Sequence, residues 1–401
     1  MTTQAVAFLA ELRAPRGREL LDAAVTGLDA GEDLLALATR LRAGNDPPGL
    51  VSAALEQAAF RRRARPKFGS DADRMFFTAA GLEQATRAEV AAHRAERFAS
   101  VHVGRTLDLC CGIGGDLIEL SRTTDDLTGI DEDPATVALA GANLDELGRS
   151  AAARAEVGDV TTTDLAGVGA AFVDPGRRTP SGRRTFDPRD YSPPFSFVAA
   201  LAGRVPATCA KVAPGLNHAL LPAGAEAEWV SSGGDVTELS LWFGPFATAG
   251  VRRRATLLPS GATLTDTSPS ATPVGALPEL GSYLHEPDGA VVRAGLVGAV
   301  VAELDGWLID PAIAYVATRA DAASPFTHRY AVRDVLPFQL KRLRAHLRAI
   351  GTGDVVVKKR GNAIDPAELR SRLRLDGNGP TRTLLLTRKG AEPFVIVAEP
   401  S

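Results

Sequence analysis

The chain has 401 residues, of which 45% are hydrophobic, with a formal net charge of −3 and three cysteines. This composition excludes a disordered chain and a small disulfide-stapled domain, and the length is typical of roughly two to four globular domains. With no leader segment, no run of roughly 18 apolar residues and no zinc-binding cysteine spacing, we expect a cytoplasmic protein without a membrane span or a metal site.

Residues 1–98 are expected to form an N-terminal helical region. Apolar residues recur at helical spacing between positions 9 and 28, and the sequence Asn-Asp-Pro-Pro-Gly at 45–49 interrupts the pattern before helices resume at Leu50. A further pair of helices extends to residue 98 and carries Gln84 and Thr86 toward the next part of the chain. These two side chains either cover a bound cofactor or are simply exposed at a helix end.

The most informative stretch is 106–116, which reads Thr-Leu-Asp-Leu-Cys-Cys-Gly-Ile-Gly-Gly-Asp. An apolar strand enters a turn in which Gly112 and Gly114 let backbone N–H groups approach a ligand. Asp108 places a carboxylate where a phosphate-binding loop would avoid one, and Leu117 takes the third glycine position of a dinucleotide fingerprint. S-adenosylmethionine suits this pattern, since it has an ammonium and a sulfonium but no pyrophosphate.

Three further strands end in acidic residues along the chain. Asp131 is the expected ligand of the ribose hydroxyls, a role that an acid plays at this point of nucleotide-binding β-α-β units. Asp159 is a candidate for the adenine amino group, with turn chemistry as the alternative. Asp174 ends the fourth strand and precedes Pro175.

The alternation of short strands with helices over 99–260 predicts a parallel α/β sheet. Strands expected at 226–231, 236–243 and 251–258 would complete its antiparallel edge, and the loop 259–273 marks a boundary.

Since S-adenosylmethionine is a methyl donor, the methyl acceptor is expected beside Asp174. The segment is similar to the Asp/Asn-Pro-Pro-aromatic loop of nucleobase amino methyltransferases but differs from it, because this chain reads Asp-Pro-Gly-Arg. Asp174 is therefore a candidate to accept a ring N–H proton, with Arg177 or Arg178 neutralising a phosphate or an anionic base. Carbon methylation through Cys209 is an alternative, although a buried thiol on a strand is the simpler interpretation. Lys211 either contacts substrate or is solvated at a strand end.

The C-terminal part is strongly basic. Between His328 and Gly390 there are fifteen Lys and Arg against five Asp and Glu, so this stretch carries +10 and the remainder −13. A helix expected over 335–350 places Lys341, Arg344 and Arg348 on one face, which suits contact with a phosphate backbone. Together with the basic run 61–67, this asymmetry favours a nucleic-acid partner.

The chain resembles the class I S-adenosylmethionine-dependent methyltransferases that carry a C-terminal THUMP-like domain. Besides the Asp-Leu-Cys-Cys-Gly-Ile-Gly-Gly-Asp core, the resemblance rests on segments distributed over nearly the whole chain: Gly81 to Thr86, Asp174 to Arg178, Lys211 to Leu216, Tyr283 to Ala290 and Lys358 to Gly361.

This resemblance implies an α/β, Rossmann-like class I methyltransferase that acts on RNA, either tRNA or rRNA. The implied parts are the helical region 1–98, the methyltransferase core 99–260, a small ferredoxin-like element 270–325 and a THUMP-like module 326–401. A methyltransferase of protein or small-molecule substrates, and a non-catalytic RNA-binding module, are the alternatives. The oligomeric state does not follow from the sequence.

Overall fold

The computed structural model describes residues 4–176, 187–275 and 280–401. The chain divides into two compact units, Met1–Glu226 with Glu238–Ala249, and Ala227–Thr237 with Gly250–Ser401. The expected N-terminal helical region and most of the expected core lie in the first unit, and the expected parts 270–325 and 326–401 lie in the second.

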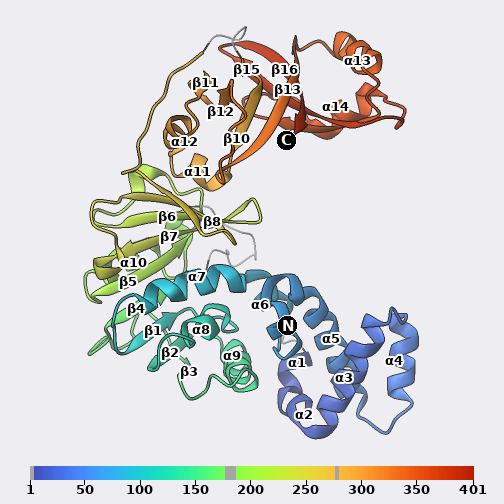
Figure 1. Cartoon of the computed structure of the whole chain (residues 1–401). Coiled ribbons are helices and arrows are strands. Elements are labelled where there is room, and N and C mark those ends of the chain that lie inside the picture. The colour runs from blue at the N-terminus through green and yellow to red at the C-terminus, as the bar shows by residue number, and fades with distance from the viewer. Residues whose placement is uncertain (1–3, 177–186, 276–279) are drawn as a thin grey trace. The chain divides into compact units, whose positions relative to one another are not determined.

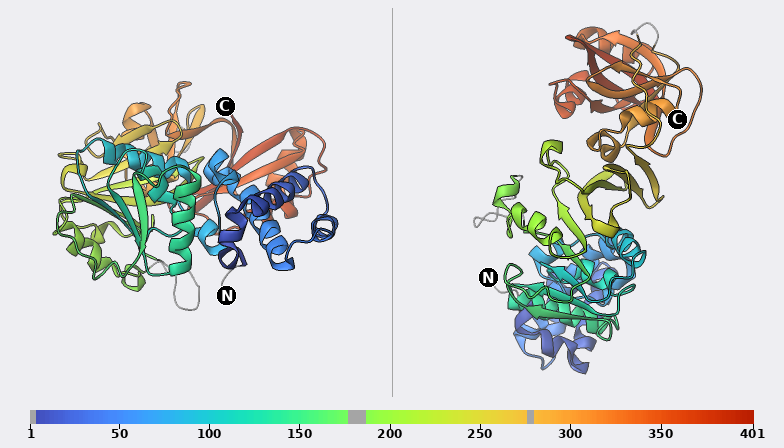
Figure 2. Two further views of the ribbon diagram at one scale, coloured as in Figure 1. Left: turned by 90° about the horizontal axis from the view of Figure 1, so that it is seen from below. Right: turned by 90° about the vertical axis from the view of Figure 1, so that its left-hand side faces the viewer.

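Helices fill the first part of the first unit and pack beside its sheet (Figures 1 and 2). Two of them begin with proline at the first turn, where its missing N–H has no helical partner to lose, and Asp33 caps a third through Leu35 and Ala36 N–H. Arg13 joins them to the helix α9 (Pro134–Glu146), which packs beside the sheet, by ion pairs with Asp145 and Glu146. These helices are α1 (Gln4–Ala7), α2 (Leu9–Arg13), α3 (Pro15–Asp29), α4 (Leu34–Arg42), α5 (Pro48–Phe68), α6 (Ala79–Gln84) and α7 (Ala88–Ala99).

The sheet of the first unit has the hydrogen-bonded order β3-β2-β1-β4-β5-β7. The first five strands are parallel and β7 is antiparallel to β5, as the alternating pattern predicts. The strands are β1 (Thr106–Leu109), β2 (Leu127–Asp131), β3 (Ala153–Val157), β4 (Ala170–Val173), β5 (Ala207–Val212) and β7 (Asp235–Phe243), and the helices between them are α8 (Gly115–Leu120), α9 (Pro134–Glu146) and α10 (Phe195–Ala202). The strand order reverses between β1 and β4, and such a switch point leaves a crevice at the carboxyl ends of the strands.

The second unit contains three strands of one sheet and the whole of another. Of these three strands, β6 (Glu226–Ser232) is parallel to β8 (Arg253–Leu258), and β8 pairs antiparallel with the short β9 (Ala262–Thr265). β9 lies inside the expected boundary loop. The second sheet has seven strands in the order β11-β12-β10-β13-β16-β15-β14. Its strands are β10 (Tyr283–Pro287), β11 (Trp307–Asp310), β12 (Ile313–Thr318), β13 (Thr327–Pro337), β14 (Asp354–Lys359), β15 (Thr381–Lys389) and β16 (Glu392–Pro400). One sheet thus unites the expected ferredoxin-like element with the expected THUMP-like module.

Besides the helix at 335–350, the sequence predicts a helix that begins at Glu286 and runs through Leu304, and both predicted starts are wrong. Glu286 lies in β10, and the helix predicted from it is two helices, α11 (Gly289–Arg293) and α12 (Val297–Glu303), separated at Gly295 with φ 69°. The basic helix α13 (Leu340–Ala349) begins five residues later than predicted because β13 extends through Pro337. In both places a strand pairing in the sheet prevails over the local helical pattern.

Alternate residues of β15 and β16 point into two apolar cores. Leu384 and Leu386 pack with α13 and with α14 (Pro366–Leu373), whereas Leu385 packs with Tyr315 of β12 and Ile396. Both faces of this part of the sheet are therefore buried. Within the described ranges, no helix has the length and apolar character needed to cross a bilayer.

Candidate functional site

The turn after β1 is shaped by three residues with positive φ. Cys110, Gly112 and Gly114 have φ angles of 64°, 56° and 90°, and Gly114 is the N-cap of α8. This left-handed region is open to glycine but costs a residue with a Cβ about 1–2 kcal/mol. Cys110 adopts it beside two glycines, so the turn stores strain at one position.

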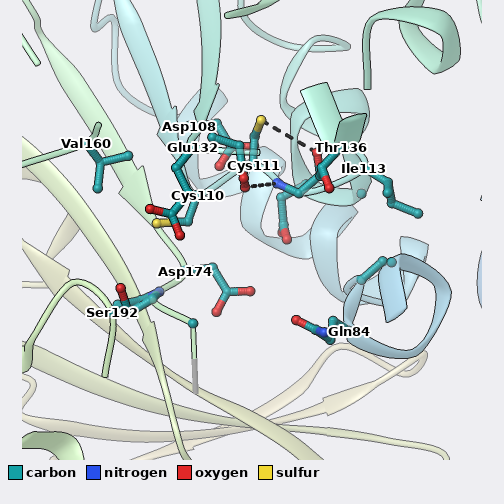
Figure 3. Close-up of a pocket in the computed structure, with 18 of the residues that line it drawn as sticks. Gln84, Asp108, Cys110, Cys111, Ile113, Glu132, Thr136, Val160, Asp174 and Ser192 are labelled. Carbon is teal, nitrogen blue, oxygen red and sulfur yellow. Dashed lines mark hydrogen bonds between the residues drawn. The ribbon is translucent and has the colours of Figure 1, made fainter. Parts of the chain in front are cut away.

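A cavity of about 640 Å³ lies at the carboxyl ends of β1, β2 and β4, and residues of α6 also line it (Figure 3). Gly114 is not among its lining residues and contributes only to the turn, as the N-cap of α8. Arg177 and Arg178 lie outside the described residues. The other predicted site residues all line the cavity: Gln84, Thr86, Asp108, Gly112, Asp131, Asp159 and Asp174.

Asp108 is fully buried on β1, and neither of its carboxylate oxygens has a hydrogen-bond partner among the described residues. Burial, followed by the nearby carboxylates of Asp116 and Asp174, raises the pKa of Asp108 well above its ordinary value. A buried polar group without a partner is costly. A cationic ligand group at this point would supply both the missing hydrogen bonds and the missing charge.

Asp131 is held by backbone N–H groups from both sides. Its oxygens accept from Gly112 N–H at 3.0 Å and from Asp133 N–H at 3.2 Å. The end of β2 is thereby tied to the glycine turn, with the carboxylate at the cavity wall.

Asp159 is an exposed residue of the cavity lining and forms a local turn. One of its oxygens accepts from the N–H and the hydroxyl of Thr161, and these hydrogen bonds lower the pKa of Asp159. The turn chemistry that was the alternative for this residue is therefore present. It does not remove the carboxylate from the cavity wall.

Gln84 and Thr86 differ in how they meet the cavity. The Gln84 amide and the Asp174 carboxylate point toward each other across it (Figure 3). The Thr86 hydroxyl donates to Asp116 Oδ2 at 2.5 Å and accepts from Lys211 Nζ at 2.8 Å, so it is already engaged inside the protein. Gln84 remains a candidate cofactor contact, whereas the hydroxyl of Thr86 has a structural partner on each side.

Three charged residues of the site were missed or underrated from the sequence. Lys211 is buried, contrary to the solvated alternative, and its ammonium lies 2.6 Å from Asp174 Oδ2. Arg94 of α7 is 1% exposed and donates to Asp116 Oδ1 at 2.9 Å and to the Glu238 carboxylate. The sequence gives no sign that Arg94 is buried, since its neighbours His93 and Glu96 are polar. Asp116 directly follows the glycine pair, which was a usable signal.

Carboxylates therefore line the cavity, and the two neighbouring buried cations, Arg94 and Lys211, are not among its lining residues. The buried Arg94 guanidinium stacks 4.2 Å from the centroid of the buried Phe172 ring of β4. The lining carboxylates include those of Asp108, Asp116, Asp131 and Asp174. This charge distribution favours a ligand with positive charge and disfavours a pyrophosphate.

Cys209 is unsuited to form a covalent adduct. It is fully buried on β5 and is not a lining residue of the cavity. Burial raises the pKa of the Cys209 thiol to about 12, which leaves almost no thiolate at neutral pH. Carbon methylation through this residue is not supported.

The basic run at 61–67 serves the fold. Arg61 is buried and donates to the backbone carbonyls of Met75 and Arg74, and Lys67 donates to those of Leu82 and Glu83 at the end of α6. Arg65 is ion-paired with Asp29 and Asp73. This run is not the free basic surface that its sequence suggested.

Most cations of the C-terminal part are engaged as well. On the predicted basic face of α13, Arg344 and Arg348 donate to the backbone carbonyls of Arg372, in the last turn of α14, and of Arg374, directly after it. They thereby attach one helix to the other. Four cationic side chains between His328 and Gly390 make no ion pair or hydrogen bond among the described residues: those of Lys341, Arg342, Lys359 and Arg374.

Two sequence segments of the second unit meet although about 70 residues separate them in the sequence. Glu286 of β10 is ion-paired with Lys358 at 2.5 Å and lies 3.5 Å from Arg360 Nε, and Tyr330 donates to the same carboxylate. Both segments belong to the motifs that the sequence analysis singled out, and here they hold strands of one sheet together.

Comparison with known proteins gives matches over most of the chain. Residues 327–400 match the family model described as THUMP domain-like, and residues 5–64 match a domain of unknown function. Two Mycobacterium tuberculosis proteins, from strains CDC 1551 / Oshkosh and ATCC 25618 / H37Rv, are each 38% identical over 363 residues, which is 88% of this chain and 96% of the relative. Both bear the name uncharacterized S-adenosylmethionine-dependent methyltransferase.

A crystal structure from Porphyromonas gingivalis W83, of a protein assigned provisionally as a methyltransferase, is similar over 89% of this chain and 92% of that one. The TM-score is 0.69 and the sequence identity 19%, so this likeness concerns the fold.

Proposed function

The chain belongs to the S-adenosylmethionine-dependent methyltransferase family, and from that premise we propose that it methylates a nucleobase in RNA. S-adenosylmethionine is the cofactor, and when bound it supplies a methyl group on a sulfonium. The finer assignments below, the residue roles and the RNA acceptor, are part of the proposal.

The cofactor contacts follow from the charges of the cavity. Asp108, whose oxygens have no partner among the described residues, is assigned to the cofactor's positively charged end. Asp131, fixed by Gly112 N–H, is assigned to the ribose hydroxyls, and Asp159 to the adenine amino group. Gln84 covers the cofactor from α6, and Thr86 supports it indirectly through Asp116.

The acceptor is assigned to the side of the cavity formed by Asp174 and the segment after it. Gly176 and Ser192 exchange backbone hydrogen bonds of 2.7 and 2.9 Å there, which fixes the wall next to Asp174. Asp174 orients the acceptor N–H and takes its proton, a role that requires hydrogen-bond distance to the reacting atom. Arg177 is proposed to contact a phosphate or the base.

The observation that carries the RNA proposal is the basic C-terminal part on a chain whose cavity is acidic. The side chains of Lys341, Arg342, Lys359 and Arg374 are the described cationic groups there without an intramolecular ion pair or hydrogen bond. A small-metabolite enzyme has no need for such a module, whereas phosphate contacts by Lys and Arg supply much of the affinity in RNA recognition.

The test uses purified protein, radiolabelled S-adenosylmethionine, and total RNA from a strain lacking this protein. A ribonuclease-treated sample and a protein extract serve as parallel acceptors, and Asp174→Asn serves as the matched variant. We expect label in intact RNA with the wild type and its loss in the ribonuclease-treated sample. Label confined to protein or small molecules would instead support the alternative substrate class.

A further inference from the structure

Lys211 connects the acceptor side of the cavity to the protein interior. Its side chain is 6% exposed, against 23% for that of Asp174, and its ammonium lies 2.6 Å from Asp174 Oδ2 and 2.8 Å from Thr86 Oγ1. Burial opposes the charge, but Asp174 and then Asp116 raise the pKa of Lys211 above its ordinary value, so the group remains an ammonium. A cation inside an acidic site needs such partners to be stable.

Thr86 extends this contact to the cofactor side. Its hydroxyl donates to Asp116 Oδ2, and the other oxygen of Asp116 accepts from Arg94 Nε at 2.9 Å. Arg94 in turn donates to Ser240 at 3.0 Å and to Glu238 on β7. An unbroken hydrogen-bonded chain therefore joins Asp174 to the centre of the first unit.

One oxygen of Asp174 is fixed by this chain and the other is not. Oδ2 receives the Lys211 ammonium, whereas Oδ1 accepts no hydrogen bond from the described residues. Holding one oxygen limits rotation of the carboxylate about its last torsion, which is otherwise broad. The second oxygen is then presented in a defined direction on the cavity wall.

We propose that Lys211 is a positioning residue that aims Asp174 at an acceptor nitrogen bearing a hydrogen. This inference rests on the proposed function, and it narrows the acceptor to N–H groups. The nitrogen lone pair forms the new N–C bond as the S–C bond breaks and its electrons remain on sulfur. The nitrogen proton leaves to Asp174 Oδ1 and from there to water.

A carboxylate in this place disfavours a hydroxyl acceptor. A hydroxyl must lose its proton to become a good nucleophile, which calls for a strong base. A carboxylate is a weak base. It suits a nitrogen that attacks first and becomes acidic once it carries the methyl group.

The first test is a double-mutant cycle on the rate of methyl transfer to the fraction that the wild type labels. We expect Lys211→Met and Asp174→Asn each to lower kcat about 100-fold, the usual cost of a misplaced reacting group. Lys211→Met should add nothing in the Asp174→Asn background, because the two residues act as a unit. Lys211→Arg should restore part of the rate. Multiplicative losses in the double variant would overturn the proposal.

The second test needs no acceptor and so separates this inference from the RNA proposal. Sinefungin carries an amine at the position of the transferred methyl, so its affinity relative to S-adenosylhomocysteine reports on the carboxylate that faces this point. We expect Asp174→Asn to lower this preference about tenfold, the scale of one charge-assisted hydrogen bond.

The direction in which Lys211→Met changes the preference for sinefungin then distinguishes a positioning role of Lys211 from a purely electrostatic one. A positioning role predicts a lower preference for sinefungin, because Asp174 is no longer aimed. A lysine that acted only as a nearby positive charge would give a higher preference once removed, and that result would overturn the proposal. Thr86→Val should act in the same direction as Lys211→Met, with Thr86→Ser as its control. If no RNA is labelled but these signs hold, the RNA acceptor fails and the role of Lys211 stands.

Discussion

Asp108 combines complete burial with two carboxylate oxygens that no described residue satisfies. Such a group lowers the stability of the protein without cofactor, and cofactor binding removes the penalty. The sequence predicted the carboxylate and its ligand from position alone. It did not reveal the complete burial of Asp108, or that Asp116 of α8 joins Asp131 and Asp174 on the wall of the same cavity.

At the residue scale we predict that Asp108→Asn stabilises the cofactor-free protein at neutral pH. The folded state raises the pKa of Asp108, so the wild type loses stability as pH rises above the unfolded value of about 4. The gain should be on the order of 1–3 kcal/mol at pH 8 and vanish near pH 4. Thermal unfolding at both pH values measures it, and an equal change at both would contradict this origin.

The same variant should bind the cofactor less tightly. Loss of one charge-assisted contact is expected to weaken S-adenosylmethionine binding roughly 30-fold in calorimetric titration. Asp159→Asn, which changes an exposed carboxylate of the same cavity, is the matched control and should have the smaller effect.

Cys110 gives a second residue-scale prediction. Because its φ of 64° costs a residue with a Cβ, Cys110→Gly should be neutral or stabilising by up to about 1 kcal/mol. Cys110→Val, with a branched Cβ in the same region, should destabilise by about 1–2 kcal/mol. Chemical denaturation of the pair measures the difference, and equal stabilities would show that the turn relaxes.

At the scale of elements, α7, α8, β4, β5 and β7 meet around one buried network. The alternating pattern predicted the strands and their parallel order, because apolar runs and glycine turns are local signals. Arg94, Glu238 and Lys211 could not be assigned to this network from sequence, since each looks like an ordinary charged residue until tertiary packing buries it. Strand pairing also decided that Glu286 lies in β10, where local chemistry suggested a helix start.

Arg94→Leu should destabilise the first unit by about 3–5 kcal/mol, because it leaves Asp116 and Glu238 buried without their cation. Burial opposes ionisation of Asp116, but Arg94 and then Lys211 lower its pKa. A lowered pKa gives stability that is present above the unfolded value of about 4 and lost below it. The penalty should therefore be full at pH 7 and shrink as pH falls through 4.

Urea unfolding across this pH range measures the Arg94 effect. Arg65→Leu removes an arginine with two exposed ion pairs in the same unit, and it should cost less than about 1 kcal/mol. Similar costs for the two variants would mean that the buried network contributes no more than surface pairs.

For the whole molecule, the charge asymmetry of the sequence overstated the free basic surface. Local counting cannot tell a solvated cation from one that caps a helix, as with Arg344 and Arg348, or from one paired across strands, as with Arg333 and Glu399. The fold class and the cofactor followed from the sequence and are confirmed by the relatives and by the structural likeness. The RNA acceptor and the residue roles remain proposals.

RNA affinity should depend on the unpaired cations. We predict that the double variant Lys341→Gln, Arg342→Gln binds total RNA several-fold more weakly. The slope of log Kobs against log salt concentration should become shallower by the equivalent of about two phosphate contacts. Arg333→Gln with Arg370→Gln removes the same charge from residues paired with Glu399 and Asp354, and should have less effect. Filter binding at several salt concentrations compares the two, and equal losses would contradict this surface.

The most direct test of the account compares modified nucleosides by mass spectrometry in RNA from three strains: one lacking the protein, one complemented with the wild type and one with Asp174→Asn. We predict a base-methylated nucleoside that is present with the wild type, absent without the protein and strongly reduced with Asp174→Asn. Identical nucleoside profiles in all three strains, with both proteins expressed and folded, would contradict an RNA methyltransferase that acts through Asp174.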